Sequence, residues 1–163
     1  MEKRVTLVPV GLEEVEFLVS IAFNGDDKLL NEYHISPGTL DHCVKHTFGF
    51  IETNAGHYND DIKFYSVNYD KQMIGYTVIV LNEKEPNELY SFGINKSHRT
   101  DEVREMWLEA VKEKLNNYFY VVLWAKNTRA INFFERHGFK VDRTDKYQGD
   151  PTKTLIVSDS IVY

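Results

Sequence analysis

The apolar and polar positions along the chain follow two different periods. Short runs of β-branched and aromatic residues between turn residues predict strands, and apolar residues three or four positions apart predict helices. The strand pattern covers Val5–Val10, Ile62–Tyr69, Met73–Leu81, Leu89–Ile94, Tyr118–Ala125, Phe139–Tyr147 and Thr154–Val162. The helix pattern covers Leu12–Phe23, a stretch from Asp26 to the break at Ser36, Leu40–Thr53, Thr100–Asn116 and Asn127–Gly138.

Several of these elements come with an expected packing or pairing. The connection Asp70-Lys71-Gln72 joins two strands into a hairpin, although it lacks the Asn-Gly or Asp-Gly signature of the tightest turns. The helix from Thr100 has one apolar stripe, and its Trp107 is expected in the core. The last two strands are expected to pair with each other.

The segment from Tyr118 to Val141 is the most informative part of the chain. Its first residues form an apolar run without alternation, which is typical of a strand covered on both faces. Asn127 can cap a following helix, and Gly138 supplies the left-handed residue that ends it. The segment therefore predicts a central strand, a helix and a further strand that starts at Phe139.

This segment also resembles a known family. Asn127, Ala130, Phe133 and the pair Gly138-Phe139 match N-x-x-A-x-x-[FL]-Y-x-x-x-G-F, a signature of the GNAT superfamily of acyl-CoA N-acyltransferases. Phe134 stands where the family usually has tyrosine. Taken alone, the segment is also compatible with an ordinary strand-helix-strand unit that ends its helix with glycine.

The order of the predicted elements extends the resemblance over nearly the whole chain. It implies an α/β (α+β) protein with the GNAT fold, in which helices cover both faces of a mixed central sheet of about seven strands. The 163 residues are expected to form one domain, residues 1–163. The resemblance further implies that the fourth strand, Leu89–Ile94, and the fifth, Tyr118–Ala125, are parallel neighbours that splay apart at their C-terminal ends. The helices before Thr53 would form one wall of the acceptor site.

Composition narrows the classes of partner. The formal net charge is −6 and the pI is near 5.5, which argues against binding to nucleic acid or anionic membranes, because both depend on surplus Lys and Arg. No apolar run approaches the about 20 residues that span a bilayer. Cys43 is the only cysteine and the first residues lack the apolar core of a signal peptide, so a cytoplasmic protein is expected.

The resemblance implies that acyl-CoA lays its pyrophosphate on backbone amides at the start of the helix after the fourth strand, usually through [QR]-x-x-G-x-[GA]. Arg99 fits the first position, but Glu102 and Arg104 occupy the two glycine positions. Asp101 and Glu102 stabilise the start of their own helix and would oppose a pyrophosphate there. Positive residues nearby could offset this, namely Lys96, His98, Arg99 and Arg104. Two interpretations stay open: CoA binds in the usual way, or the acids merely cap the helix.

The implied contacts with acyl-CoA follow from the same register. Asn127 would bond the pantetheine arm, with a plain helix cap as the alternative. The expected cofactor-binding residues are Ile94, Arg99, Thr100, Arg104, Asn127, Ala130 and Phe134.

Two residues are candidates for catalysis. Glu88 occupies the place of the family's carboxylate base at the start of the fourth strand, and amine acylation needs a base because a protonated amine is no nucleophile. The alternative is a solvated glutamate beside a turn. Phe134 cannot protonate a departing thiolate, so Tyr90 or Tyr147 would have to substitute.

Other chemistry is weakly indicated. His42 and His46 have metal-ligand spacing, but no further ligands complete a set, and we expect no metal. The resulting prediction is transfer of acetyl from acetyl-CoA to a primary amine of a small molecule or peptide, by a protein that could form a homodimer. The alternative, favoured by the missing glycines and tyrosine, is a catalytically lapsed GNAT-like binding or assembly module, for example one associated with a phage.

Overall fold

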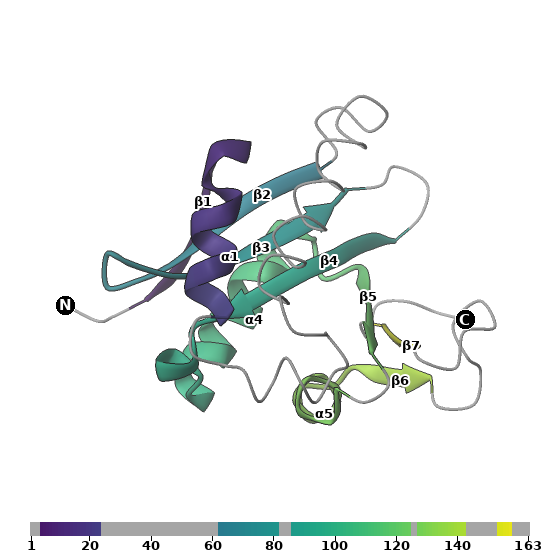
Figure 1. Ribbon diagram of the computed structural model, residues 1–163. Helices are drawn as coiled ribbons and strands as arrows, with labels where there is room; N and C mark the ends of the chain where they lie inside the picture. Colours follow the sequence, from purple (N-terminus) through teal and green to yellow (C-terminus); the bar gives the residue numbers. More distant parts are fainter. Residues whose placement is uncertain (1–3, 24–61, 82–85, 125–126, 143–152, 158–163) are drawn as a thin grey trace.

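One seven-stranded sheet organises the structure (Figure 1). The computed structural model describes residues 4–23, 62–81, 86–124, 127–142 and 153–157. The strands are β1 (Val5–Pro9), β2 (Ile62–Tyr69), β3 (Gln72–Val80), β4 (Asn87–Ile94), β5 (Phe119–Trp124), β6 (Lys140–Asp142) and β7 (Lys153–Val157). The helices are α1 (Val15–Phe23), α4 (Asp101–Lys114) and α5 (Thr128–Arg136), with short 3-10 helices η1 (Leu12–Glu14) and η3 (Lys96–His98). The two helices expected between Asp26 and Thr53 lie outside the described residues.

The order of strands in the sheet is β1-β2-β3-β4-β5-β7-β6. All neighbouring strands are antiparallel except β4 and β5, which are parallel. The last strand, β7, inserts between β5 and β6 and pairs with both. The expected mixed sheet is therefore confirmed, and so is the pairing of the last two strands.

β4 and β5 separate after a short stretch of pairing. Their register runs from Asn87 opposite Phe119 to Leu89 opposite Val121. β4 then continues to Ile94 along β3, while β5 continues along β7. This confirms the prediction that the two strands are parallel neighbours and diverge toward their C-terminal ends.

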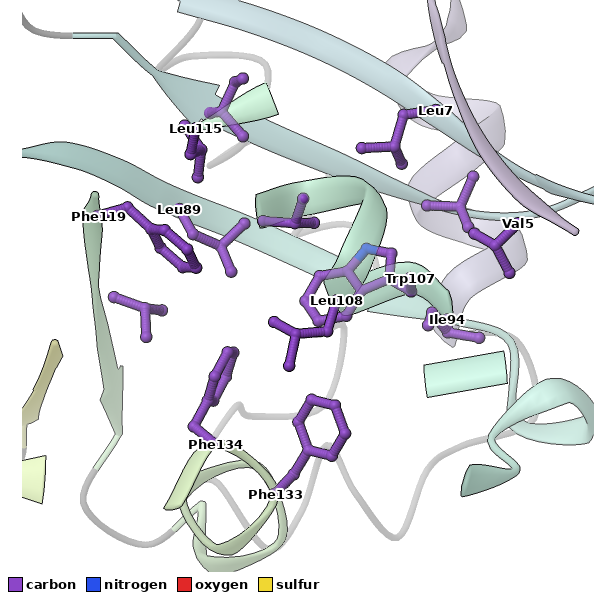
Figure 2. Close-up of a cluster of buried hydrophobic side chains, with 14 of the residues drawn as sticks. Val5, Leu7, Leu89, Ile94, Trp107, Leu108, Leu115, Phe119, Phe133 and Phe134 are labelled. Atoms are coloured by element: carbon purple, nitrogen blue, oxygen red, sulfur yellow. The ribbon is translucent and has the colours of Figure 1, made fainter. Parts of the chain in front are cut away.

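Helices cover both faces of the sheet. On one face, Leu18 and Val19 of α1 pack on Phe64, Tyr76 and Val78 in a buried apolar cluster. On the other face, α4 and α5 bury the larger cluster (Figure 2). The aromatic side chains of that cluster include Trp107, Phe119, Phe133, Phe134 and Phe139, and Trp107 is in the core as expected. The two faces are thus distinct environments, one beneath α1 and one beneath α4 and α5.

The hairpin between β2 and β3 is tighter than expected. Tyr69 pairs directly with Gln72, so only Asp70 and Lys71 connect the strands, and the expected three-residue connection is wrong. Both residues are left-handed, with φ of 51° and 65°. Two left-handed residues match the twist of a two-residue hairpin, even though glycine usually takes one of these positions. The twist of the two strands therefore determines the conformation of this connection, although lysine is not a residue that usually occupies such a turn.

Candidate active site

β4 contains a β-bulge at Tyr90. Leu89 pairs with Ile79 and Ser91 pairs with Val78, so Tyr90 is the extra residue of β4. A regular strand alternates its side chains between the two faces, and a bulge interrupts that alternation. Successive side chains of β4 can therefore point to the same face at this position.

Three side chains of β4 face the α1 side of the sheet. Tyr90 packs against the apolar cluster beneath α1. The hydroxyl oxygen of Ser91 lies 2.9 Å from that of Tyr76, which belongs to the same cluster. Leu89 is buried in the opposite cluster, so its neighbour Glu88 faces α1 by alternation. Alternation thus puts Glu88 and Tyr90 on this face and the bulge adds Ser91, so a carboxylate and two hydroxyl groups lie together where β4 and β5 begin to separate.

Glu88 is half-buried in the second position of β4, not exposed beside a turn. Burial raises the pKa of its carboxyl group, because the charged form loses water, and a hydrogen bond from Tyr120 partly opposes the rise. The Tyr120 hydroxyl donates to Oε1 of Glu88 across 3.4 Å. A carboxylate with a raised pKa in a half-buried site has the properties required of a general base.

Tyr90 lies two residues from Glu88 on the same face. Burial raises the pKa of its phenol, and the nearby charge of Glu88 raises it further. Its hydroxyl therefore keeps its proton near neutral pH and can act as a donor. The structure brings the two predicted catalytic residues together, whereas Tyr147 lies outside the described residues.

The start of α4 is capped by Thr100. The Thr100 hydroxyl accepts a hydrogen bond from the backbone N–H of Val103 at 3.2 Å. Asp101 and Glu102 are exposed in the first turn, and Asp101 forms a loose surface ion pair with Arg104 at 3.8 Å. The first amides of a helix have no partner within the helix, so those of Asp101 and Glu102 keep the donor character of a helix start. The cap is therefore made by a threonine and not by the acids.

Positive charge gathers next to this helix start. The pKa of Arg104 is lowered, first because burial removes water from its guanidinium. Asp101 opposes this change, and Arg99, Arg136 and Arg129 lower the pKa further by repulsion. Guanidinium groups from the loop and from α5 thus act on that of Arg104, and an anion bound next to Arg104 would relieve this repulsion.

Arg99 also has a structural use that the sequence did not indicate. Its Nε donates to the backbone oxygen of Ile94 at 2.7 Å, and its Nη2 donates to that of Ala22 at 3.3 Å. Asn95, which follows β4, donates from Nδ2 to the oxygen of Ile21 at 2.7 Å. The loop between β4 and α4 is therefore fastened to the last turn of α1.

The remaining residues that were predicted to bind acyl-CoA or to add positive charge near this loop lie in different environments. Ile94 is buried in the larger cluster. His98, expected to add positive charge near the helix start, packs edge-on against Tyr69, with the ring centroids 6.1 Å apart. Lys96 is exposed in η3. Arg99 and Arg104 are thus the basic residues of the predicted set that the structure brings together.

The residues of α5 take structural positions. Oδ1 of Asn127 accepts from the N–H of Ala130 at 3.2 Å, which confirms the helix cap. Gly138 follows α5 with φ of 89°, as expected for the residue that ends a helix. Phe134 is fully buried in the larger cluster (Figure 2). Its ring lies 6.0 Å from that of Phe92 on β4. The position that carries tyrosine in the family is here a core position.

Tyr120 and Asn95 are site residues that the sequence analysis missed. Tyr120 belongs to an apolar run, and only the register of β5 against β4 places it beside Glu88. Asn95 follows a strand, where an isolated asparagine usually indicates a turn. Neither position carries a local signal of its contact.

Some predictions cannot be compared with the structure. His42, Cys43 and His46 lie outside the described residues. Within the part that is described, no three His, Cys, Asp or Glu residues gather as metal ligands. No helix in the same part is long and apolar enough to cross a membrane.

The sequence profile of the acetyltransferase (GNAT) family matches residues 29–139, which is more than half of the chain. The chain therefore belongs to the acetyltransferase (GNAT) family. Members of this class transfer acyl groups from acyl-CoA, so general acyltransferase chemistry is supported. Among curated proteins, none matches the chain.

Solved structures share the fold at low sequence identity. An acetyltransferase from Thermus thermophilus superposes with a TM-score of 0.73 at 21% identity, and the match covers 94% of this chain and 96% of the other. The PaiA N-acetyltransferase from Thermoplasma acidophilum, solved in complex with coenzyme A, gives 0.68 at 18% identity and covers 97% and 99%. FdhC, described as a nucleotide-linked sugar GNAT, gives 0.65 at 16% identity and covers 96% and 88%. These likenesses show the fold.

Proposed function

We propose that the protein transfers an acetyl group from acetyl-CoA to a primary amine of a small molecule or peptide. The observation that carries this proposal is the joint placement of Glu88 and Tyr90. Both are half-buried on the α1 face of β4, at the point where β4 and β5 separate. A base and a proton donor at that opening are the two groups that amine acylation from a thioester needs.

The expected chemistry is a direct attack of the amine on the thioester carbonyl. The carboxylate of Glu88 takes a proton from the ammonium or the attacking amine, and its raised pKa makes it a stronger base than an exposed glutamate. The C–S bond breaks as the amide forms, and the Tyr90 hydroxyl gives its proton to the departing thiolate. The raised pKa of Tyr90 keeps that proton in place until sulfur takes it.

Donor binding is proposed at the start of α4. The first-turn amides and the arginine group around Arg104 supply positive partial and full charges for the pyrophosphate. The ion pair between half-buried Arg104 and exposed Asp101 is long, at 3.8 Å, and therefore weak, so a phosphate can replace Asp101 as the partner of Arg104. Thr100 at the start of α4, and Asn127 and Ala130 at the start of α5, are the other proposed contacts. The similar PaiA structure contains coenzyme A, which supports use of this donor.

A second candidate is a GNAT-like binding or assembly module without acyl-CoA chemistry. Two observations favour it: Phe134 is fully buried and carries no hydroxyl, and Glu102 and Arg104 replace the glycines through which phosphates approach the backbone. Under this alternative, Arg99 and Thr100 only stabilise the loop and the helix.

A thermal-shift measurement distinguishes the two. Acetyl-CoA at 100 times its Kd would add about 2.7 kcal/mol of stability, enough to raise the midpoint by several degrees. A panel of primary amines, followed by thiol release, then tests transfer, with Glu88→Gln as the control that keeps size but removes the base. The proposal is overturned if millimolar acetyl-CoA leaves the midpoint unchanged and no amine is acetylated. That result would favour the binding module.

A further inference from the structure

The parallel register of β4 and β5 sets Glu88 and Tyr120 opposite each other. Only the pair Leu89–Val121 follows before the strands separate. Val121 is buried with the larger cluster, so Tyr120 points to the other face, toward α1, as Glu88 does. Backbone pairing therefore fixes Tyr120 beside the candidate base, immediately before the opening between the strands.

The contact between these side chains is a hydrogen bond in which the phenol donates. Its length of 3.4 Å exceeds the usual about 2.5–3.0 Å of an O–H···O bond, and bonds of catalytic groups are often long before a substrate binds. A hydroxyl donor stabilises an ionised carboxylate more than a protonated one. The bond therefore favours the form of Glu88 that can accept a proton.

The other groups around Glu88 on the described elements do not supply such a donor. Its partner on β3 is Val80, which is apolar. On this face of the sheet, the part of α1 that belongs to the cluster against which Tyr90 packs is also apolar, with Val15, Leu18, Val19 and Ala22. Tyr90, on β4 itself, feels the charge of Glu88, and that charge raises the pKa of Tyr90. Among these groups, Tyr120 is the one that lowers the pKa of Glu88.

We propose that Tyr120 is a positioning residue for Glu88: its hydroxyl holds Oε1 and orients the carboxylate toward the opening between β4 and β5. The second oxygen, Oε2, is then the one that accepts the proton from the amine. This role rests on the proposed acyltransfer for its purpose, but the contact itself can be measured without any reaction.

The test compares Tyr120→Phe with Tyr118→Phe. Both changes remove one phenol hydroxyl next to or within β5, and Tyr118 is 41% exposed, so it serves as the matched control. The ring that remains in Tyr120→Phe keeps the packing, and circular dichroism with a melting curve checks that each variant folds. Glu88→Gln identifies the Glu88 signal in a carbon-13 NMR titration of the side-chain carboxyl groups, since that signal disappears.

The expected result is a titration of Glu88 that moves to higher pH in Tyr120→Phe and stays in place in Tyr118→Phe. The acid limb of the pH profile of kcat/KM should also move to higher pH in Tyr120→Phe, because the base must be ionised. The loss of kcat/KM should therefore be larger at acidic pH than on the alkaline plateau. A merely structural tyrosine would lower the rate equally at all pH values.

Two outcomes separate this inference from the proposed function. In the first outcome, the wild type acetylates amines and the acid limb of its kcat/KM profile depends on Glu88, but Tyr120→Phe changes neither this limb nor the titration of Glu88. The inference is then wrong and the proposed function stands. If no amine is acetylated but the Glu88 titration moves only in Tyr120→Phe, the contact is supported and the proposed function fails.

Discussion

The indole nitrogen of Trp107 donates a hydrogen bond to the hydroxyl of Thr77 across 3.0 Å inside the core. Trp107 is 2% exposed and Thr77 is 0% exposed, so water cannot replace either partner. The bond joins α4 to β3 on the face opposite α1. It holds the helix that starts at the proposed phosphate site against the middle of the sheet.

Replacing Trp107 by Phe is expected to lower the free energy of unfolding by about 2–4 kcal/mol, because it leaves a cavity and a buried hydroxyl without its donor. Urea denaturation followed by circular dichroism measures the change. Thr77→Val should cost clearly less in the Trp107→Phe background than in the wild type, because the donor has already gone. Additive losses would mean that the two side chains do not depend on each other.

Glu88 is expected to reduce stability at neutral pH. Its pKa is raised above the ordinary value of 4.5, so the folded state disfavours the charge, and stability is lost as pH rises from that value through the raised pKa. Glu88→Gln should therefore be more stable than the wild type at pH 8, with a smaller difference at pH 4. Urea denaturation at several pH values checks this.

The matched control is Glu113→Gln, which removes the same charge from an exposed position on α4. It should not reproduce the pH-dependent gain. The same Glu88→Gln change should slow transfer by about 10²–10⁴-fold, the usual contribution of a general base. A variant that is both less stable at pH 8 and fully active would contradict the role given to Glu88.

Phe134→Tyr restores the hydroxyl that the family usually has at this position. Because Phe134 is fully buried, the added hydroxyl should cost about 1–3 kcal/mol of stability if it finds no partner. If the opening between β4 and β5 admits the thioester sulfur next to this ring, kcat should rise while KM for acetyl-CoA stays nearly constant. Steady-state kinetics and urea denaturation measure the two effects.

Phe133→Tyr is the control for that experiment, since Phe133 is the adjacent buried ring on α5, at 7% exposure. It should lose stability without gaining kcat. An unchanged kcat in Phe134→Tyr would mean that the hydroxyl remains inside the core and that proton donation comes from elsewhere.

Arg104→Gln is expected to raise KM for acetyl-CoA about tenfold, the loss of roughly 1.4 kcal/mol, because a charge-assisted phosphate contact disappears. Stability should change little, since the ion pair of Arg104 with Asp101 is long and Asp101 is exposed. Lys112→Gln removes a cation from the same helix two turns away, where Lys112 pairs with Glu109, and should leave KM unchanged. Equal KM values in both variants would place the phosphates elsewhere.

The sequence predicts a structural feature best where the residues that determine it are close together in the chain. Asn127 and Gly138 mark the ends of α5 because a cap and a left-handed glycine act within a few residues of themselves. Glu88 could be singled out because the family places a carboxylate at the start of the fourth strand, and Tyr90 was a candidate because Phe134 lacks the hydroxyl of the family's tyrosine. Glu88 and Tyr90 share a face by the regular alternation of a strand, but Ser91 joins that face only through a bulge that pairing with β3 creates, and nothing in β4 alone indicates the bulge.

Contacts between residues that are far apart in the chain could not be predicted from the sequence. Tyr120 reaches Glu88 only through the register of two parallel strands that are 32 residues apart at these positions. Arg99 has the right charge for a phosphate, but its bonds to backbone oxygens far along the chain cannot be inferred from composition or spacing. Asp70 and Lys71 were misjudged because strand twist outweighs the local preference of lysine.

The side chains of Asn95 and Arg99 donate hydrogen bonds to the carbonyl oxygens of Ile21 and Ala22. The loop between β4 and α4 and the end of α1 are therefore held together. The resemblance to the family implies that the helices before Thr53 form one wall of the acceptor site. A shift of this loop when acetyl-CoA binds would therefore move that wall. By linkage, binding of the acceptor would change the affinity for acetyl-CoA by the same coupling free energy. Cooperative binding of the two substrates, and with it a preferred kinetic order, would then arise from two side chains that take part in neither bond making nor bond breaking.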